Sequence, residues 1–236
     1  LYLRLRTLYP KAILLESSDY HGHENAYSFV CFNPAACFTV SNSEVTREFP
    51  GKEKEKFMLS ANRKLHDELD AFFKLFDVDS DEIELPANGL FGYINFDAVQ
   101  HLENIHFTAE KKDGYQIPEV KYCFYKYIVA IDHHKNRIHM VENLLEGESS
   151  QMDYIHHLLI NLNFSTGKFK ALENETSNIT DEEYKQMVIK GKEHCYRGDV
   201  FQIVLSRQFS QQYEGDDFNV YRALRSINPS PYLFYF

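Results

Sequence analysis

The sequence predicts an α+β fold, built from layered, largely antiparallel sheets with helices packed outside them. Two patterns indicate it. Residues 120–142 contain two runs rich in β-branched and aromatic residues around the polar turn His133–Asn136, which is typical of a hairpin. Residues 57–76 predict an amphipathic helix. Its apolar side chains recur at helical spacing, at Leu65, Leu69, Phe72, Phe73 and Phe76.

The composition excludes several classes of protein. Hydrophobic residues make up 44% of the 236-residue chain and aromatic residues 15%, which is enough for a packed core. The net charge of −10 argues against a nucleic-acid-binding surface. No run approaches the roughly 18 apolar residues of a membrane span, so we predict no membrane partner.

The cysteines and histidines do not predict a cross-link or a metal site. Cys31, Cys37, Cys123 and Cys195 fit neither a disulfide scaffold nor a zinc ribbon, so we expect reduced thiols in a cytoplasmic protein. None of the histidines has metal-ligand spacing with carboxylates or thiols. They include the pairs His133–His134 and His156–His157 and the loop residues His21 and His23.

Short apolar runs in the first half predict further strands. They cover residues 11–18, 26–32 and 37–40, and we expect a turn at Asn33–Pro34 between the last two. The stretch 89–103 opens with an apolar run around two glycines, which allow backbones to approach closely within a sheet. These glycines are Gly89 and Gly92, and a helix is expected over residues 149–163.

The composition changes after residue 163. Residues 164–179 are polar and rich in Ser, Thr and Asn, as in a linker. Thr180 and Glu183 then form a capping-box pattern, which predicts a helix to about Tyr196 that stops near Gly198. A long strand over residues 200–213 and a helix over residues 218–227 should follow. We therefore predict an N-terminal domain over 1–163, a linker over 164–179 and the start of a second domain over 180–236.

The chain ends inside a run with strand composition. Residues 232–236 are apolar and aromatic, and they follow the rigid stretch 226–231. Nothing after them could supply a neighbouring strand, so we expect the final strand to be unpaired. We also expect the chain to be the front half of a larger protein.

Three stretches carry candidate site residues. Glu16 and Ser17 end a strand, where a carboxylate and a hydroxyl could bind an ammonium group, although an exposed strand end is commoner. The prolines of Asn228–Tyr232 fix an extended backbone, either as a pocket wall or as a strand entrance. Strand alternation places Gln202 among valines, as a core polar group or as part of a site.

Taken together and in order, four motifs resemble component I of anthranilate synthase, a family of chorismate-utilising enzymes. The motifs are "LLES", "GLFGYINFDAV", "GDVFQIVLSRQF" and "YRALRSINPSPYLFYF". The resemblance implies a truncated fold like that of aminodeoxychorismate synthase, with residues 180–236 as the incomplete start of the chorismate-binding domain. It also implies a lyase that converts chorismate and ammonia to anthranilate and pyruvate. Further implications are Mg²⁺ held by ligands outside this chain, a glutamine amidotransferase subunit as partner, and feedback inhibition by tryptophan.

The resemblance also assigns site residues. Tryptophan should bind Leu15, Glu16 and Ser17 on one side, and Asn228, Pro229, Ser230, Pro231, Tyr232 and Leu233 on the other. Leu233 stands where many members have Met, and Tyr27 stands where some have a ligand-binding Lys. Gln202 is the candidate active-site residue, because ammonia users have Gln where water users have a basic Lys.

Two alternatives remain open. Component I of aminodeoxychorismate synthase shares the fold and the "GLFGY" region. A stand-alone amino-acid-binding module would have no chemistry at all. Under the leading interpretation the chain by itself is expected to be inactive, because the resemblance implies that the remaining catalytic groups lie beyond Phe236.

Overall fold

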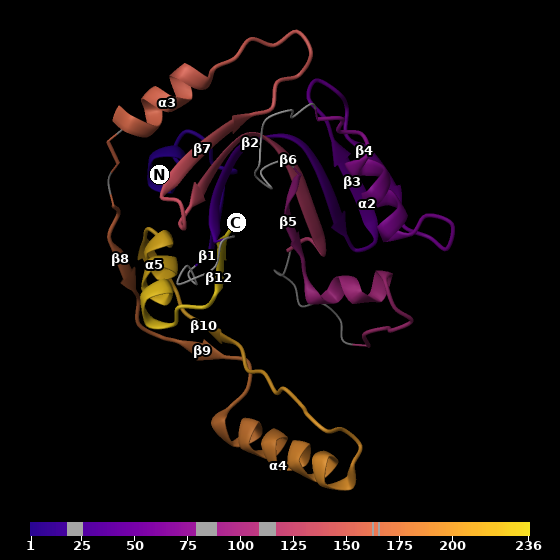
Figure 1. Ribbon diagram of the computed structural model, residues 1–236. Coiled ribbons are helices and arrows are strands. Elements are labelled where there is room, and N and C mark those ends of the chain that lie inside the picture. Colours follow the sequence, from indigo (N-terminus) through magenta and orange to yellow (C-terminus); the bar gives the residue numbers. More distant parts are fainter. Residues whose placement is uncertain (18–25, 79–88, 109–116, 162, 165) are drawn as a thin grey trace. The chain divides into compact units, whose positions relative to one another are not determined.

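The computed structural model describes the chain except for residues 18–25, 79–88, 109–116, 162 and 165 (Figure 1). The predicted loop that carries His21 and His23 lies outside the described residues. The chain divides into two compact units. The first comprises Leu1–Phe164 together with Pro229–Phe236, and the second comprises Ser165–Asn228. The predicted second domain, by contrast, runs on from residue 180 to Phe236.

The first unit is built on one curled sheet, which in the described part of the chain has eight strands (Figure 1). Their order is β12-β1-β2-β3-β4, and β6 pairs with β2, β5 and β7. Every pairing is antiparallel, which confirms the predicted fold class. The strands are β1 (Ile13–Ser17), β2 (Tyr27–Ser41), β3 (Glu44–Glu48), β4 (Glu55–Met58), β5 (Leu90–Ile94), β6 (Val120–Asp132), β7 (Arg137–Glu142) and β12 (Tyr232–Tyr235).

In the residues that the structure describes, four short helices accompany this sheet. They are α1 (Tyr2–Leu5), α2 (Leu65–Phe73), the 3-10 helix η1 (Phe96–His101) and α3 (Met152–Asn161). None of the helices in the described residues is long and apolar enough to cross a membrane.

β2 corrects one prediction. The expected turn at Asn33–Pro34 is a β-bulge inside a continuous strand, because the ladder with β6 continues on both sides of it. The register shifts between Pro34 and Ala36, and Asn33 has a positive φ of 56°. A bulge tolerates a proline, which cannot donate a ladder hydrogen bond.

α2 is shorter than the predicted helix over residues 57–76. Residues 55–58 instead form β4, because they pair with β3 along its edge. The buried face of the helix behaves as predicted. Phe72 is fully buried, and its ring centroid lies 5.5 Å from that of Phe38. Arg47 on β3 holds the helix through a 2.6 Å ion pair with Glu68.

A disulfide joins β2 to β6, which makes the prediction of reduced thiols wrong for one pair of cysteines. Cys37 and Cys123 face each other across the ladder, with their Cα atoms 4.1 Å apart. Their separation of 86 residues hides this proximity from spacing rules. Cys31 and Cys195 are free thiols, and burial raises the pKa of Cys31.

Gly92 has the role predicted for it. A Cβ built on this residue of β5 would lie 1.8 Å from the carbonyl oxygen of Lys121 and 2.7 Å from the Cα of Tyr122. Only a glycine therefore allows β5 to approach β6 at this register. Gly89 has no such role, because its Cβ would meet nothing within 4 Å.

The predicted hairpin is confirmed as β6 and β7. Its turn is fixed by Asp132, whose carboxylate accepts hydrogen bonds from the backbone amides of Lys135 at 2.9 Å and His134 at 3.0 Å. These bonds lower the pKa of Asp132, and the bond from Lys135 has the largest effect. The turn therefore carries a stabilising negative charge at neutral pH.

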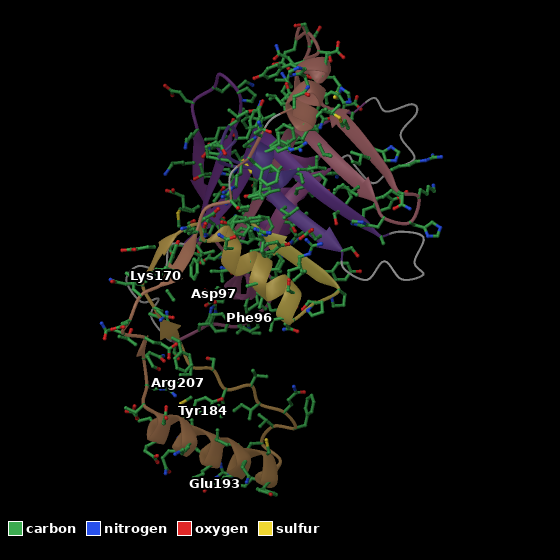
Figure 2. All side chains as sticks on the ribbon, turned by 90° about the vertical axis from the view of Figure 1, so that its left-hand side faces the viewer. Phe96, Asp97, Lys170, Tyr184, Glu193 and Arg207 are labelled. Atoms are coloured by element: carbon green, nitrogen blue, oxygen red, sulfur yellow. A yellow bond between two sulfur atoms is a disulfide. The ribbon has the colours of Figure 1, made fainter. Side chains whose placement is uncertain are left out.

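The second unit confirms both predicted helices, α4 (Asp181–Arg197) and α5 (Phe218–Ile227). The capping box of Thr180 and Glu183 is formed, and Gly198 ends α4 in the left-handed conformation, with φ 79°. In Figure 2, the labelled side chains Tyr184 and Glu193 project from α4.

The strands of the second unit differ from the prediction. The expected linker contains β8 (Phe169–Ala171) and β9 (Thr176–Ser177), which pair with β11 (Tyr213–Gly215) and β10 (Phe209–Ser210). Residues 200–208, predicted as a strand, form none, because no described strand pairs with them. Strand composition cannot replace a hydrogen-bonding neighbour, and Phe201 is 99% exposed.

Candidate functional site

Pairing of the final strand with β1 builds the candidate site within the first unit. β12 lies antiparallel to β1, so the final strand is not unpaired, contrary to our expectation. Glu16 is opposite Leu233 and Ser17 is opposite Tyr232. The "LLES" segment and the end of the "NPSPYLF" segment are therefore adjacent in one sheet, although more than half of the sequence lies between them.

Hydrogen bonds hold the end of β1 in place. The backbone amide of Ser17 donates to the hydroxyl of Ser28 at 3.3 Å. That hydroxyl, in a residue only 2% exposed, lies 2.7 Å from Nε2 of His133 in the hairpin turn. The strand end therefore presents Glu16 and Ser17 from a fixed backbone.

Glu16 supplies a carboxylate at the end of β1, opposite Leu233 of β12. A carboxylate accepts hydrogen bonds and can pair with an ammonium group. This is the interaction that an amino-acid ligand would require.

Aromatic side chains surround this strand pair. Tyr232 is 80% exposed and Phe234 is 66% exposed, which is unusual for such large apolar groups. The ring centroid of Phe236 lies 5.5 Å from that of Phe234 and 5.1 Å from that of Tyr93. The exposed rings form a surface against which a planar apolar ligand can pack.

Tyr27 begins β2, which pairs with β1 on the side away from β12. Its ring centroid is 6.1 Å from that of Phe29, and the ring of Phe29 is 5.5 Å from that of Phe91. Some relatives are expected to have a lysine at the position of Tyr27. This chain instead has an aromatic ring there and supplies no cation.

The remaining predicted residues lie outside this strand pair. Pro229, Ser230 and Pro231 lead into β12. Asn228 belongs to the second unit, where its backbone amide donates to the carbonyl of Leu224 at 2.8 Å and ends α5. Gln202 is an exposed residue of the second unit, in the stretch that forms no strand. Its catalytic role stays a prediction.

The described residues do not fit a Mg²⁺ site. Among them, no group of three or more His, Cys, Asp or Glu side chains is arranged to hold a metal ion. Mg²⁺ prefers carboxylate and water oxygens in octahedral geometry.

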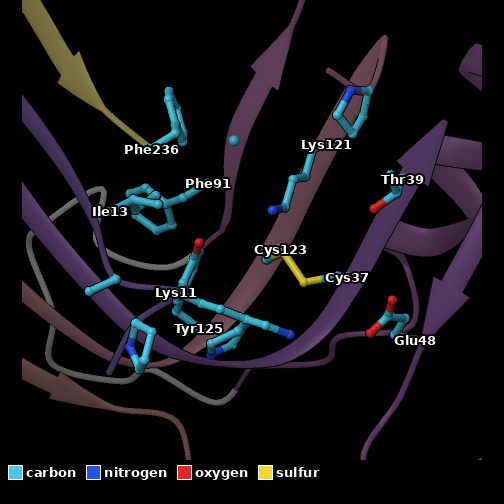
Figure 3. Close-up of a pocket in the computed structure, with 15 residues that line it drawn as sticks. Lys11, Ile13, Cys37, Thr39, Glu48, Phe91, Lys121, Cys123, Tyr125 and Phe236 are labelled. Atoms are coloured by element: carbon cyan, nitrogen blue, oxygen red, sulfur yellow. A yellow bond between two sulfur atoms is a disulfide. The ribbon is translucent and has the colours of Figure 1, made fainter. Parts of the chain in front are cut away.

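A cavity of about 260 Å³ lies above the disulfide and was not predicted from the sequence (Figure 3). It lies within the first unit, and none of the nine residues assigned to tryptophan lines it. Two lysines, Lys11 and Lys121, reach it from different segments. The only available signal was the alternation of β6, which places Lys121 and Cys123 on the same face.

The whole site region matches one family of enzymes. The family described as chorismate binding enzyme matches residues 11–236. Anthranilate synthase alpha subunit 1 of Arabidopsis thaliana is 34% identical over 173 residues, covering 63% of this chain and 29% of that protein. Anthranilate synthase component 1 of Acetivibrio thermocellus is 34% identical over 164 residues, covering 62% of this chain and 33% of that protein.

Two further similarities extend over most of the chain. Anthranilate synthase component 1 of Lactococcus lactis is 25% identical over 99% of this chain and 51% of its own length. The crystal structure of anthranilate synthase component I from Streptococcus pneumoniae has the same fold, with a TM-score of 0.58 and 24% identity over 86% of this chain and 46% of that one. The chain thus spans about half or less of the length of these relatives.

Proposed function

Because the chain belongs to the chorismate-binding enzyme family, we propose that it functions as part of anthranilate synthase component I. The reaction combines chorismate with ammonia and releases anthranilate, pyruvate and water. A glutamine amidotransferase subunit supplies the ammonia, and the pathway leads to tryptophan in the cytoplasm. Mg²⁺ would be held by residues outside this chain. The similarity to anthranilate synthase subunits of plants and bacteria, at 25–34% identity, supports this assignment.

We propose Gln202 as a residue at the edge of the active site. A neutral amide cannot take a proton from water at neutral pH, but it can accept a hydrogen bond from ammonia and donate one to a substrate oxygen. Gln202 therefore favours an ammonia-using enzyme over a water-using relative.

The remaining catalytic groups are proposed to lie outside these 236 residues, so the chain alone should not turn over chorismate. The measurement is anthranilate fluorescence after incubation with chorismate, ammonium and Mg²⁺, with heat-denatured chain as the blank. We expect no signal above that blank. Anthranilate formation by the purified chain would show that the described residues suffice, and it would overturn this part of the proposal.

We further propose that tryptophan binds at the β1–β12 strand pair as a feedback inhibitor. The observation that supports this is the register, which sets Glu16 and Ser17 opposite Leu233 and Tyr232. Ser17 and the exposed rings of Tyr232 and Phe234 share one face of the strand pair and suit an indole. Glu16 lies with Leu233 on the other face and suits the ligand ammonium, which reaches it around the strand end. Burying roughly 150–250 Å² of indole at about 25 cal/mol/Å² gives about 4–6 kcal/mol before ordering costs. Leu233 stands where many members of the family are expected to have Met, and the two side chains have similar volumes.

Titration calorimetry with L-tryptophan tests this site. We expect selective micromolar binding, with L-phenylalanine binding more weakly because it buries less aromatic area. Glu16→Gln should weaken tryptophan at least tenfold, because a hydrogen bond to a charged group contributes about 1.5–3 kcal/mol. The matched control Glu55→Gln, on edge strand β4, should leave affinity unchanged.

Three results would contradict the tryptophan proposal. One is equal affinity for L-tryptophan and L-phenylalanine. Another is an equal loss of tryptophan affinity in Glu16→Gln and Glu55→Gln. The third is no binding to a folded sample, which would favour component I of aminodeoxychorismate synthase as the relative whose function this chain shares.

A further inference from the structure

The cavity above the disulfide is lined by side chains of the sheet, and its two lysines are exposed residues. Its volume is about 260 Å³, and its lining combines charged, hydroxyl and aromatic side chains from β1, β2, β5 and β6 and their neighbours. Cys37 and Cys123 form part of this lining. Thr39 and Lys121 are opposite each other in the ladder, one pair further along the same face. The sheet therefore fixes the positions from which these side chains enter the cavity.

The charge in the cavity is unbalanced. Lys11 and Lys121 both line it, and neither makes an ion pair within the described part of the chain. The single side-chain carboxylate in the described lining is that of Glu48, which already pairs with Lys54 at 2.8 Å. Figure 3 shows the two lysine side chains on either side of the disulfide. On a chain of net charge −10, this leaves a local excess of positive charge.

The remaining walls are apolar or neutral. Phe91 and Phe236 contribute aromatic rings, and Ile13 contributes a branched aliphatic side chain. Burial raises the pKa of Tyr125, so its hydroxyl is a neutral hydrogen-bond donor at physiological pH. The volume lies just below the roughly 300–1,000 Å³ of sites for drug-sized ligands, so the cavity suits a molecule with a single ring.

We propose that this cavity binds a small carboxylate with a single-ring apolar body. The carboxylate contacts the ammonium groups of Lys11 and Lys121, and the ring packs against Phe91 and Phe236. Ion-paired hydrogen bonds to both lysines fix the orientation of the carboxylate. A cation of the same shape is repelled by the lysines, and a neutral amide can accept hydrogen bonds from them but supplies no negative charge. None of the nine residues assigned to tryptophan lines this cavity, although Phe91 and Phe236 also belong to the aromatic surface near the strand pair. The proposal does not depend on the proposed reaction.

Titration of the isotope-labelled full chain with benzoate, followed by amide NMR, tests the proposal. We expect saturable shifts at Phe91, Gly92 and Lys121, with a dissociation constant below about 1 mM for a ligand of this size. Benzamide and benzylamine have the same ring without the negative charge, and they should bind at least tenfold more weakly. Lys121→Gln should weaken benzoate about tenfold or more.

Two control variants make the result decisive. Lys56→Gln removes an exposed lysine that pairs with Glu44 on the β3–β4 edge, and it should leave benzoate affinity unchanged. Glu16→Gln should also leave it unchanged, because Glu16 does not line the cavity. Equal binding of benzoate and benzamide would overturn the proposal. So would equal losses in Lys121→Gln and Lys56→Gln, or shifts that centre on Glu16 and Tyr232.

Discussion

Gly92→Ala is expected to lower the free energy of unfolding by about 3 kcal/mol, the upper end of the range for overpacked interiors. The new Cβ would lie 1.8 Å from the Lys121 carbonyl oxygen and 2.7 Å from the Cα of Tyr122. Both atoms belong to the backbone of β6, so neither can rotate away as a side-chain end could. Relief requires β5 to move off β6, which breaks ladder hydrogen bonds between Leu90–Ile94 and Val120–Phe124.

Gly89→Ala is the matched control for that substitution. Its Cβ meets nothing within 4 Å and its φ is not positive, so its stability should stay within about 0.5 kcal/mol of the parent chain. Urea unfolding followed by circular dichroism measures both variants, since the chain has no tryptophan to report by fluorescence. If both variants unfold at the parent midpoint, the close approach of β5 to β6 is not what requires Gly92.

The elements that sequence reasoning located best carry their own signals. α4 begins at a capping box and ends at a left-handed glycine, and both signals lie within a few residues of the boundary that they set. The β6–β7 hairpin was equally readable, because its turn residues lie between its two strands. Local chemistry determines such boundaries, so a single sequence is sufficient to place them.

The elements that it misplaced depend on distant partners. Residues 55–58 are a strand because β3 lies beside them, and residues 200–208 are not one because no described strand does. The continuous β2 also depends on β6, which lies about a hundred residues away in sequence. Strand propensity measures fit to a neighbour, and the sequence does not say where that neighbour is.

The candidate site shows the same division. Glu16, Ser17 and Tyr232 could be identified from their residue types and from a family resemblance. That Glu16 faces Leu233 in one ladder could not be read from the sequence, because β12 was expected to have no partner. The cavity with Lys11 and Lys121 was not predicted, because nothing in the sequence distinguishes these two lysines from the other lysines of the chain.

Reduction of the Cys37–Cys123 disulfide is expected to have the largest effect on stability, a loss of about 4–5 kcal/mol in the chain-entropy account for a cross-link of this span. The two cysteines are 86 residues apart, so the bond removes a large share of the freedom of the unfolded chain. The folded state changes little, because β2 and β6 remain paired over most of their length without it. The effect therefore acts mainly through the unfolded state.

Urea unfolding with and without reductant measures this difference, and Cys37→Ser reproduces the reduced state without reductant. Cys195→Ser is the matched control, because that thiol is exposed and free, and its unfolding should match the parent chain under both conditions. A urea midpoint that reductant leaves unchanged would contradict the prediction. So would alkylation of all four cysteines in chain that is unfolded without reductant, because it would show that no disulfide is present.

Because the disulfide lines the cavity, benzoate titration of Cys37→Ser also separates its effect on stability from its effect on the shape of the cavity. Retained affinity would mean that the sheet alone shapes the cavity, whereas lost affinity in a folded chain would mean that the cross-link holds Lys121 in position.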